Sequence, residues 1–121
     1  MMLELLSGEF SVCKLEAPLA VLPAGLCFLA NTDQEYSLVC ETADVPAAGV
    51  IAREDGWCAM RVSGQLDFSL IGILAGISQT LAAARVGIFV VSTYDTDYIL
   101  LKERDLDRAL DALSAAGYEI A

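Results

Sequence analysis

The second half of the chain, residues 60–121, alternates between two kinds of hydrophobic pattern. Apolar residues recur every three or four positions in two segments and predict amphipathic helices at residues 70–84 and 106–113. Alternating or β-branched runs predict four strands, at residues 60–66, 88–93, 97–102 and 118–120. Gly87 and Gly117 follow the two helical segments, where glycine commonly ends a helix. The predicted order is βαββαβ, an α+β ferredoxin-like unit.

The first half, residues 1–59, contains strand-like runs that repeat runs of the second half. Residues 28–32 align with residues 89–93 at an offset of 89 − 28 = 61, and Tyr36 aligns with Tyr98 at 98 − 36 = 62. The repeat predicts two copies of one ancestral unit, residues 1–59 and 60–121. The alternative is chance similarity among short apolar strands.

Prolines distinguish the two copies. They interrupt the first-half segments that correspond to the helices of the second half, at Pro18, Pro23 and Pro46. Because proline costs about 3 kcal/mol inside a helix, we expect both helices of the first copy to be eroded to short turns.

The hairpin predicted at residues 88–102 is apolar on both faces. Ile88 and Val90 point one way, and Phe89 and Val91 point the other. Helices cover only one face of such a sheet, so the other face or an edge must meet the other copy or a second subunit. We therefore expect the sheets to lie side by side and the protein to form a homodimer.

The amino-acid composition limits the classes of partner that the protein can bind. With 7 Lys and Arg against 17 Asp and Glu the formal net charge is −10, so nucleic acid and anionic membranes are poor partners. The longest uncharged runs, residues 17–32 and 68–84, are broken by proline or diluted by polar residues and are too short to span a membrane. No basic segment follows Met1, and we expect a cytoplasmic protein.

Candidate chemistry is sparse. The chain has no His. No two of its four cysteines form a C-x-x-C pair; they are Cys13, Cys27, Cys40 and Cys58. We expect no metal site and no cofactor, and we expect the cysteines to be buried free thiols. Without His no Ser–His or Cys–His pair can form, which argues against an enzyme.

Residues 66–74 and 92–100 resemble the ACT domain, in the tandem form similar to aspartokinase regulatory regions and the cytosolic arginine sensor. The resemblance is strong over residues 60–121 and weaker over 1–59. It implies two ferredoxin-like units with sheets side by side, and amino acids or similar small effectors bound at domain or subunit interfaces. The Pro-Gly pair usual before the first helix is absent, because Leu70 and Ile71 precede Gly72.

Two segments are candidate ligand-binding residues. The loop that opens the first helix offers backbone N–H groups and a close approach for a ligand carboxylate, at Asp67, Phe68, Ser69, Leu70, Ile71 and Gly72. The hairpin end offers carboxylates for an ammonium group and hydroxyls beside them, at Ser92, Thr93, Asp95 and Asp97. A plain helix cap and a solvated turn are the alternatives.

The predicted function is a regulatory protein that binds an amino acid or similar effector and has no catalytic activity. The alternative is a ligand-free interaction module that docks on a partner enzyme through its sheet edge. An enzyme using Asp95 and Asp97 ranks below both. If the helix-opening loop and the hairpin are not the site, we expect it near Thr32 and Glu35.

Overall fold

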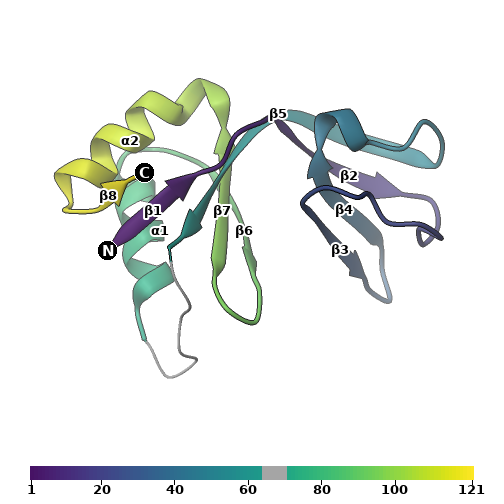
Figure 1. Ribbon diagram of the computed structural model, residues 1–121, viewed down its shortest axis with the longest axis horizontal. Helices are drawn as coiled ribbons and strands as arrows, with labels where there is room; N and C mark the ends of the chain where they lie inside the picture. Colours follow the sequence, from purple (N-terminus) through teal and green to yellow (C-terminus); the bar gives the residue numbers. More distant parts are fainter. Residues whose placement is uncertain (64–70) are drawn as a thin grey trace. The chain divides into compact units, whose positions relative to one another are not determined.

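The computed structural model describes residues 1–63 and 71–121 and divides the chain into two compact units (Figure 1). The strand unit is Gly8–Trp57, and the helical unit combines Met1–Ser7 with Cys58–Ala121. Strand β5, Val50–Val62, passes from the first unit into the second. No helix in the described part of the chain is long and apolar enough to cross a membrane.

The helical unit has the predicted βαββαβ order. After β5 come α1 (Ile73–Ala83), β6 (Ile88–Ser92), β7 (Asp97–Lys102), a 3₁₀ turn (Glu103–Asp105), α2 (Leu106–Ala115) and β8 (Glu119–Ile120). The strands are ordered β8-β1-β5-β7-β6. Strand β1 (Met2–Leu5) lies between β5 and β8, antiparallel to the first and parallel to the second. The compact units therefore do not divide at residues 59 and 60, because residues 1–7 pack with the C-terminal part.

One hydrophobic core joins the helices to this sheet. Ile77 and Leu81 of α1 and Ala109 and Leu113 of α2 are fully buried against strand residues such as Leu3. Ile88 and Val90 also pack in this core, so the alternate residues of β6, Phe89 and Val91, lie on the other face. This is the two-faced hairpin that the sequence predicts.

The two helices end differently. At α2 the predicted cap is present, because Gly117 is left-handed (φ +97°) and Tyr118 N–H donates to the Leu113 carbonyl at 3.0 Å. At α1 the left-handed residue is Arg85 (φ 62°) and not Gly87, so that prediction was wrong. Val86 N–H donates to the Leu81 carbonyl at 2.9 Å.

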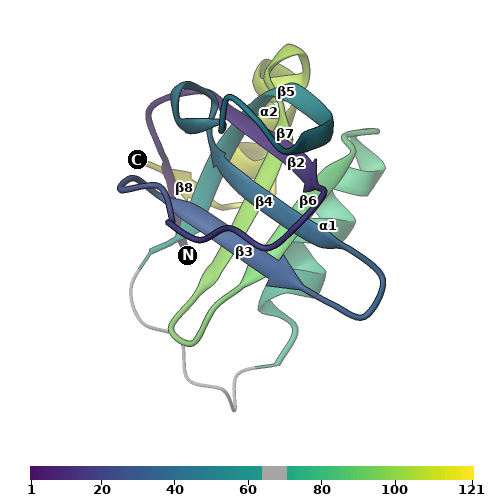
Figure 2. The same cartoon turned by 90° about the vertical axis from the view of Figure 1, so that its right-hand side faces the viewer.

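The strand unit contains no α-helix. Its strands are β2 (Phe10–Leu15), β3 (Cys27–Asn31), β4 (Tyr36–Glu41) and the first part of β5, in the antiparallel order β3-β4-β2-β5 (Figure 2). Its core consists of Cys13, Leu15, Leu38 and Cys40. The segments that the repeat equates with helices, residues 17–26 and 45–49, are bends and irregular chain.

The hairpins of the two units share one spacing. Strands β3 and β4 and the 3₁₀ turn Thr42–Asp44 each begin 61 residues before β6, β7 and the turn Glu103–Asp105 (88 − 27, 97 − 36 and 103 − 42). Both hairpin turns close with a Thr N–H bond, to a carbonyl three residues on, of 2.9 Å at Thr32 and 2.8 Å at Thr93. Tyr36 therefore corresponds to Asp97, and the offset of 62 is corrected to 61. The equal spacing favours the predicted duplication.

Candidate functional site

The first predicted segment lies at the start of α1. Asp67, Phe68, Ser69 and Leu70 fall outside the described residues, so their predicted roles as caps and ligand contacts stay predictions. Ile71 is 94% exposed. Gly72 is the N-cap residue, left-handed at φ +84°, and a Cβ there would meet no described atom within 4 Å.

This helix start has no side-chain cap in the described part of the chain. The first turn of a helix carries N–H groups without partners inside the helix, and they sit at the positive end of its dipole. Such groups can bind an anion, and no described atom covers the backbone at Gly72 within 4 Å of a Cβ there.

The second predicted segment is the turn between β6 and β7. The structure brings Ser92 and Asp97 together, because the Ser92 hydroxyl donates to Asp97 Oδ1 at 2.6 Å. The Thr93 hydroxyl donates to the Thr96 carbonyl at 3.1 Å, so it closes the turn. Asp95 lies on the exposed side of the turn. Asp97 is therefore held in place through Oδ1, and its Oδ2 accepts no side-chain hydrogen bond from the described residues.

Thr96 was not among the predicted site residues. Its side chain is buried, and its hydroxyl donates to the carbonyl of Val62 at 2.8 Å. The bond fastens the turn to the end of β5, the strand that leads toward α1. The N-terminal end of α1 and the β6–β7 turn lie at the same end of the helical unit (Figure 1). No local pattern in the sequence marks Thr96 as buried, because its neighbours form a polar turn.

A second unpredicted cluster surrounds Arg61. Its guanidinium donates to Glu4 Oε2 at 3.0 Å, approaches the Tyr98 hydroxyl at 3.5 Å and lies 5.8 Å from the centre of that ring. The hydrogen bond from Arg61 lowers the pKa of the Glu4 carboxyl. Arg61 stands between the buried Met60 and Val62, so its side chain lies on the opposite face from the core. Its cation is already partnered.

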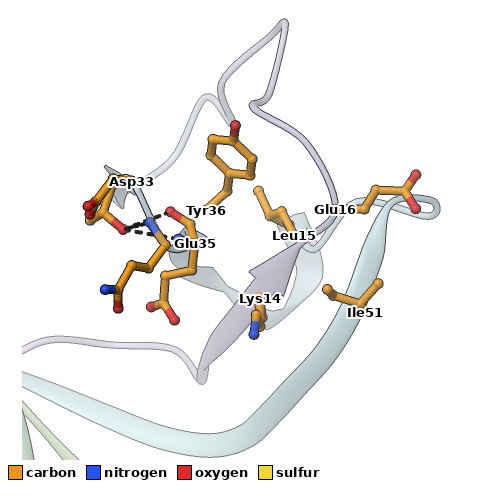
Figure 3. Close-up of a pocket in the computed structure, with 9 residues that line it drawn as sticks. Lys14, Leu15, Glu16, Asp33, Glu35, Tyr36 and Ile51 are labelled. Atoms are coloured by element: carbon orange, nitrogen blue, oxygen red, sulfur yellow. Dashed lines mark hydrogen bonds between the residues drawn. The ribbon is translucent and has the colours of Figure 1, made fainter.

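The strand unit has an open pocket of about 360 Å³ at the end of its sheet (Figure 3). The pocket contains the two residues that we named as the fallback site, Thr32 and Glu35. It is lined by Lys14, Leu15, Glu16, Thr32, Asp33, Gln34, Glu35, Tyr36 and Ile51. The volume lies at the small end of the range typical of ligand sites.

The pocket combines a cation, carboxylates and apolar surface. No described carboxylate forms an ion pair with Lys14. Glu35 accepts a hydrogen bond of 2.8 Å from the Ser37 hydroxyl. The pairing of β2 with β5 jumps from Ala52 to Val50, which makes Ile51 the extra residue of a bulge with its side chain 59% exposed. Bulges of this kind redirect a side chain.

The thiols differ in exposure. Cys13, Cys40 and Cys58 are buried, but Cys27 is half-buried, so the expectation of four buried thiols was wrong at one position. Burial raises the pKa of all three buried thiols, that of Cys40 to about 11. No group of three or more Cys, Asp or Glu residues in the described ranges is arranged to hold a metal ion.

Comparison with known proteins identifies relatives. The family model of the ACT domain matches residues 52–115. A protein of Agobacterium tumefaciens is 31% identical, with 99% of this chain and 91% of that chain covered and a TM-score of 0.88. A Vibrio cholerae protein of unknown function is 20% identical, covering 92% and 85%, with a TM-score of 0.74. The regulatory subunit of Thermus thermophilus aspartate kinase, in a ligand-free form, is 11% identical, covering 95% and 96%, with a TM-score of 0.64.

Proposed function

Because the chain belongs to the ACT domain family, we propose that it is a regulatory protein that binds an amino acid or similar small effector and has no catalytic activity. One observation carries the choice of site. No described atom lies within 4 Å of a Cβ at Gly72, at the start of α1. The turn that leads into Asp97 lies at the same end of the helical unit, and the Ser92 hydroxyl holds the Asp97 carboxylate.

The two features suit the two charged groups of an α-amino acid. Backbone N–H groups at the start of α1 can donate to its carboxylate, and Asp97 can accept from its ammonium group. Charge-assisted bonds of this kind contribute about 1.5–3 kcal/mol each. The Thr96–Val62 bond supports the arrangement because it restricts movement of the turn.

The first experiment is a thermal-shift screen of the purified protein against all amino acids and common nucleotides. An effector present at a hundredfold excess over its Kd stabilises the folded state by about 2.7 kcal/mol. A ligand found in this way is then titrated by calorimetry against variants. A screen with no shift contradicts effector binding.

The variant that tests the site is Asp97→Ala. We expect it to weaken effector binding at least tenfold, about 1.4 kcal/mol, because the ammonium group loses its acceptor. Asp111→Ala is the matched control, since Asp111 is exposed on α2 and its loss changes the net charge equally. Equal affinities of the parent and Asp97→Ala would move the site elsewhere.

Gly72 gives a second test that needs a stability control. A bulky side chain there should block the approach to the helix start, but any side chain is also strained at φ +84°. Binding by Gly72→Leu is therefore compared with Gly72→Ala, which also places a Cβ at this left-handed position but has much less bulk. Lower affinity in Gly72→Leu alone supports the site.

The pocket of the strand unit is the second location for the effector. Lys14 can pair with a carboxylate and Glu35 with an ammonium group, beside the apolar Ile51. Lys14→Ala separates the two locations, because it should weaken binding only if the effector lies here.

The alternative function rests on the sheet edge. Strand β6 pairs only with β7 among the described strands, so its outer edge leaves backbone groups for another strand. In this alternative the protein is a ligand-free interaction module that docks on a partner enzyme through this edge. It is favoured if the screen finds no effector.

A further inference from the structure

Three of the four cysteines gather in the strand unit. Cys13 on β2 and Cys40 on β4 belong to its buried core, and the half-buried Cys27 on β3 packs against that core. The side chains of Cys27 and Cys40 therefore lie on the same face of the sheet.

The strand register places Cys27 directly opposite Cys40. On the same two strands, the bond from the Thr32 N–H to the Glu35 carbonyl makes Thr32 and Glu35 a hydrogen-bonded pair. Hydrogen-bonded and non-hydrogen-bonded pairs alternate along an antiparallel ladder, and Cys27 is an odd number of residues (32 − 27 = 5) from Thr32. Cys27 and Cys40 thus form a non-hydrogen-bonded pair, whose Cα atoms lie about 4.5 Å apart, within the range that a disulfide bridges.

The other pairings in this unit do not fit a disulfide. Cys13 lies opposite Leu38, two residues from Cys40, and such diagonal neighbours are about 7–8 Å apart. Cys13 and Cys27 have β4 between their strands, which separates them by about 9–10 Å. Both separations exceed what a disulfide spans without backbone movement.

We propose that Cys27 and Cys40 are a redox modification site, at which hydrogen peroxide converts the two thiols into a disulfide across β3 and β4. In the first step the Cys27 sulfur attacks the peroxide O–O bond and takes one oxygen, forming a sulfenic acid and releasing water. In the second step the Cys40 sulfur attacks the Cys27 sulfur, the hydroxyl leaves, and the Cys40 proton completes a second water. Two thiols are oxidised, and one hydrogen peroxide is reduced to two waters.

The burial of the two thiols sets the order of the steps. Cys27 is accessible from solvent at the edge strand, whereas Cys40 is fully buried. Desolvation, with smaller contributions from Cys13 and Asp44, raises the pKa of Cys40 to about 11, so Cys40 is protonated near neutral pH and is a poor nucleophile toward peroxide. Cys27 is the peroxide-reactive thiol and Cys40 the resolving thiol.

Oxidation would tie β3 to β4. Strand β3 pairs with β4 alone among the described strands. Backbone hydrogen bonds to a strand therefore hold β3 on one side only. A covalent link closes the hairpin at the end away from its turn, which limits fraying of β3 and of the segment before it. The proposal does not depend on effector binding.

Peptide mapping tests the linkage. Reduced protein is treated with hydrogen peroxide, alkylated, and digested without reductant by a protease that cleaves after glutamate. Cleavage after Glu9, Glu16, Glu35 and Glu41 puts Cys13, Cys27 and Cys40 into separate peptides. We expect residues 17–35 linked to residues 36–41, and release of both by dithiothreitol. Linkage to the Cys13 peptide, a bond between chains, or irreversible oxidation of Cys27 with free Cys40 would overturn the proposal.

Variants and stability provide the second readout. Cys27→Ser and Cys40→Ser should each abolish the linkage, while Cys13→Ser, the matched control, should keep it. The oxidised parent should unfold at a higher temperature than the reduced parent, and this rise should be absent in Cys27→Ser. If Cys40→Ser does not fold, the comparison of Cys27→Ser with the parent still tests the proposal, because Cys27 is only half-buried. An equal rise in Cys27→Ser contradicts the proposal.

Discussion

The hydroxyl of Thr96 donates a 2.8 Å hydrogen bond to the carbonyl of Val62, and it joins residues 34 positions apart. This bond places the turn that carries Asp97 against the strand that leads to α1. The equivalent position of the strand-unit hairpin, Glu35, lines the open pocket instead.

Removing this bond should cost stability. Thr96→Val keeps the side-chain shape but leaves the Val62 carbonyl without its donor, so we expect a loss of about 1–3 kcal/mol. Thr96→Ser retains the hydroxyl and should lose less. Urea unfolding of the three proteins measures the difference, and a Thr96→Val variant as stable as the parent would show that the bond contributes nothing.

The left-handed residue after α1 offers a stabilising substitution. Arg85 has a φ of 62°, a conformation that costs a residue with a Cβ roughly 1 kcal/mol. Arg85→Gly should therefore raise the free energy of unfolding by up to about 1 kcal/mol, less the flexibility that glycine adds to the unfolded chain. Arg85→Ala keeps the Cβ and should not gain; an equal gain in both variants would point to the lost charge.

Stability should fall at alkaline pH because of the buried thiols. Unfolded cysteines ionise at their ordinary pKa of 9.0, while burial raises the pKa of Cys40 to about 11. Between these values the folded state keeps a proton that the unfolded state has lost, so stability decreases as pH rises from 9 to 11. Cys40→Ala should show a smaller decrease across this interval in urea titrations at successive pH values. A decrease as steep as that of the parent would exclude Cys40 as a contributor.

We expect a homodimer formed through a sheet edge. Light scattering at micromolar concentration should give a mass near twice the 12.9 kDa of one chain. Val91→Lys should shift the protein toward monomer, because charged residues on an edge strand oppose pairing. Ser114→Lys, at an exposed position of α2 and away from any strand, is the control. A parent mass near that of one chain would contradict this expectation.

Local pattern was sufficient for the elements of the helical unit. The β6–β7 hairpin, the apolar stripes of both helices and the Gly117 cap follow from residues close in sequence, whose spacing matches one period of backbone geometry. The predicted ACT resemblance is confirmed by the family match over residues 52–115. The predicted ligand contacts and the assignment of residues 1–59 as an eroded copy stay predictions.

Long-range packing decided the rest. Strand β1 joins the helical unit because β5 and β8 leave a place between them, which no periodicity in residues 2–5 encodes. The left-handed residue that follows α1 is Arg85 and not Gly87, because Val86 is 5% exposed in the core and its burial sets where the chain turns. Cys27 and Cys40 show no motif in the sequence and meet only through the β3–β4 register. The sequence by itself determined what each segment forms, whereas the pairing of distant segments depended on which edges and core positions the remaining chain left available.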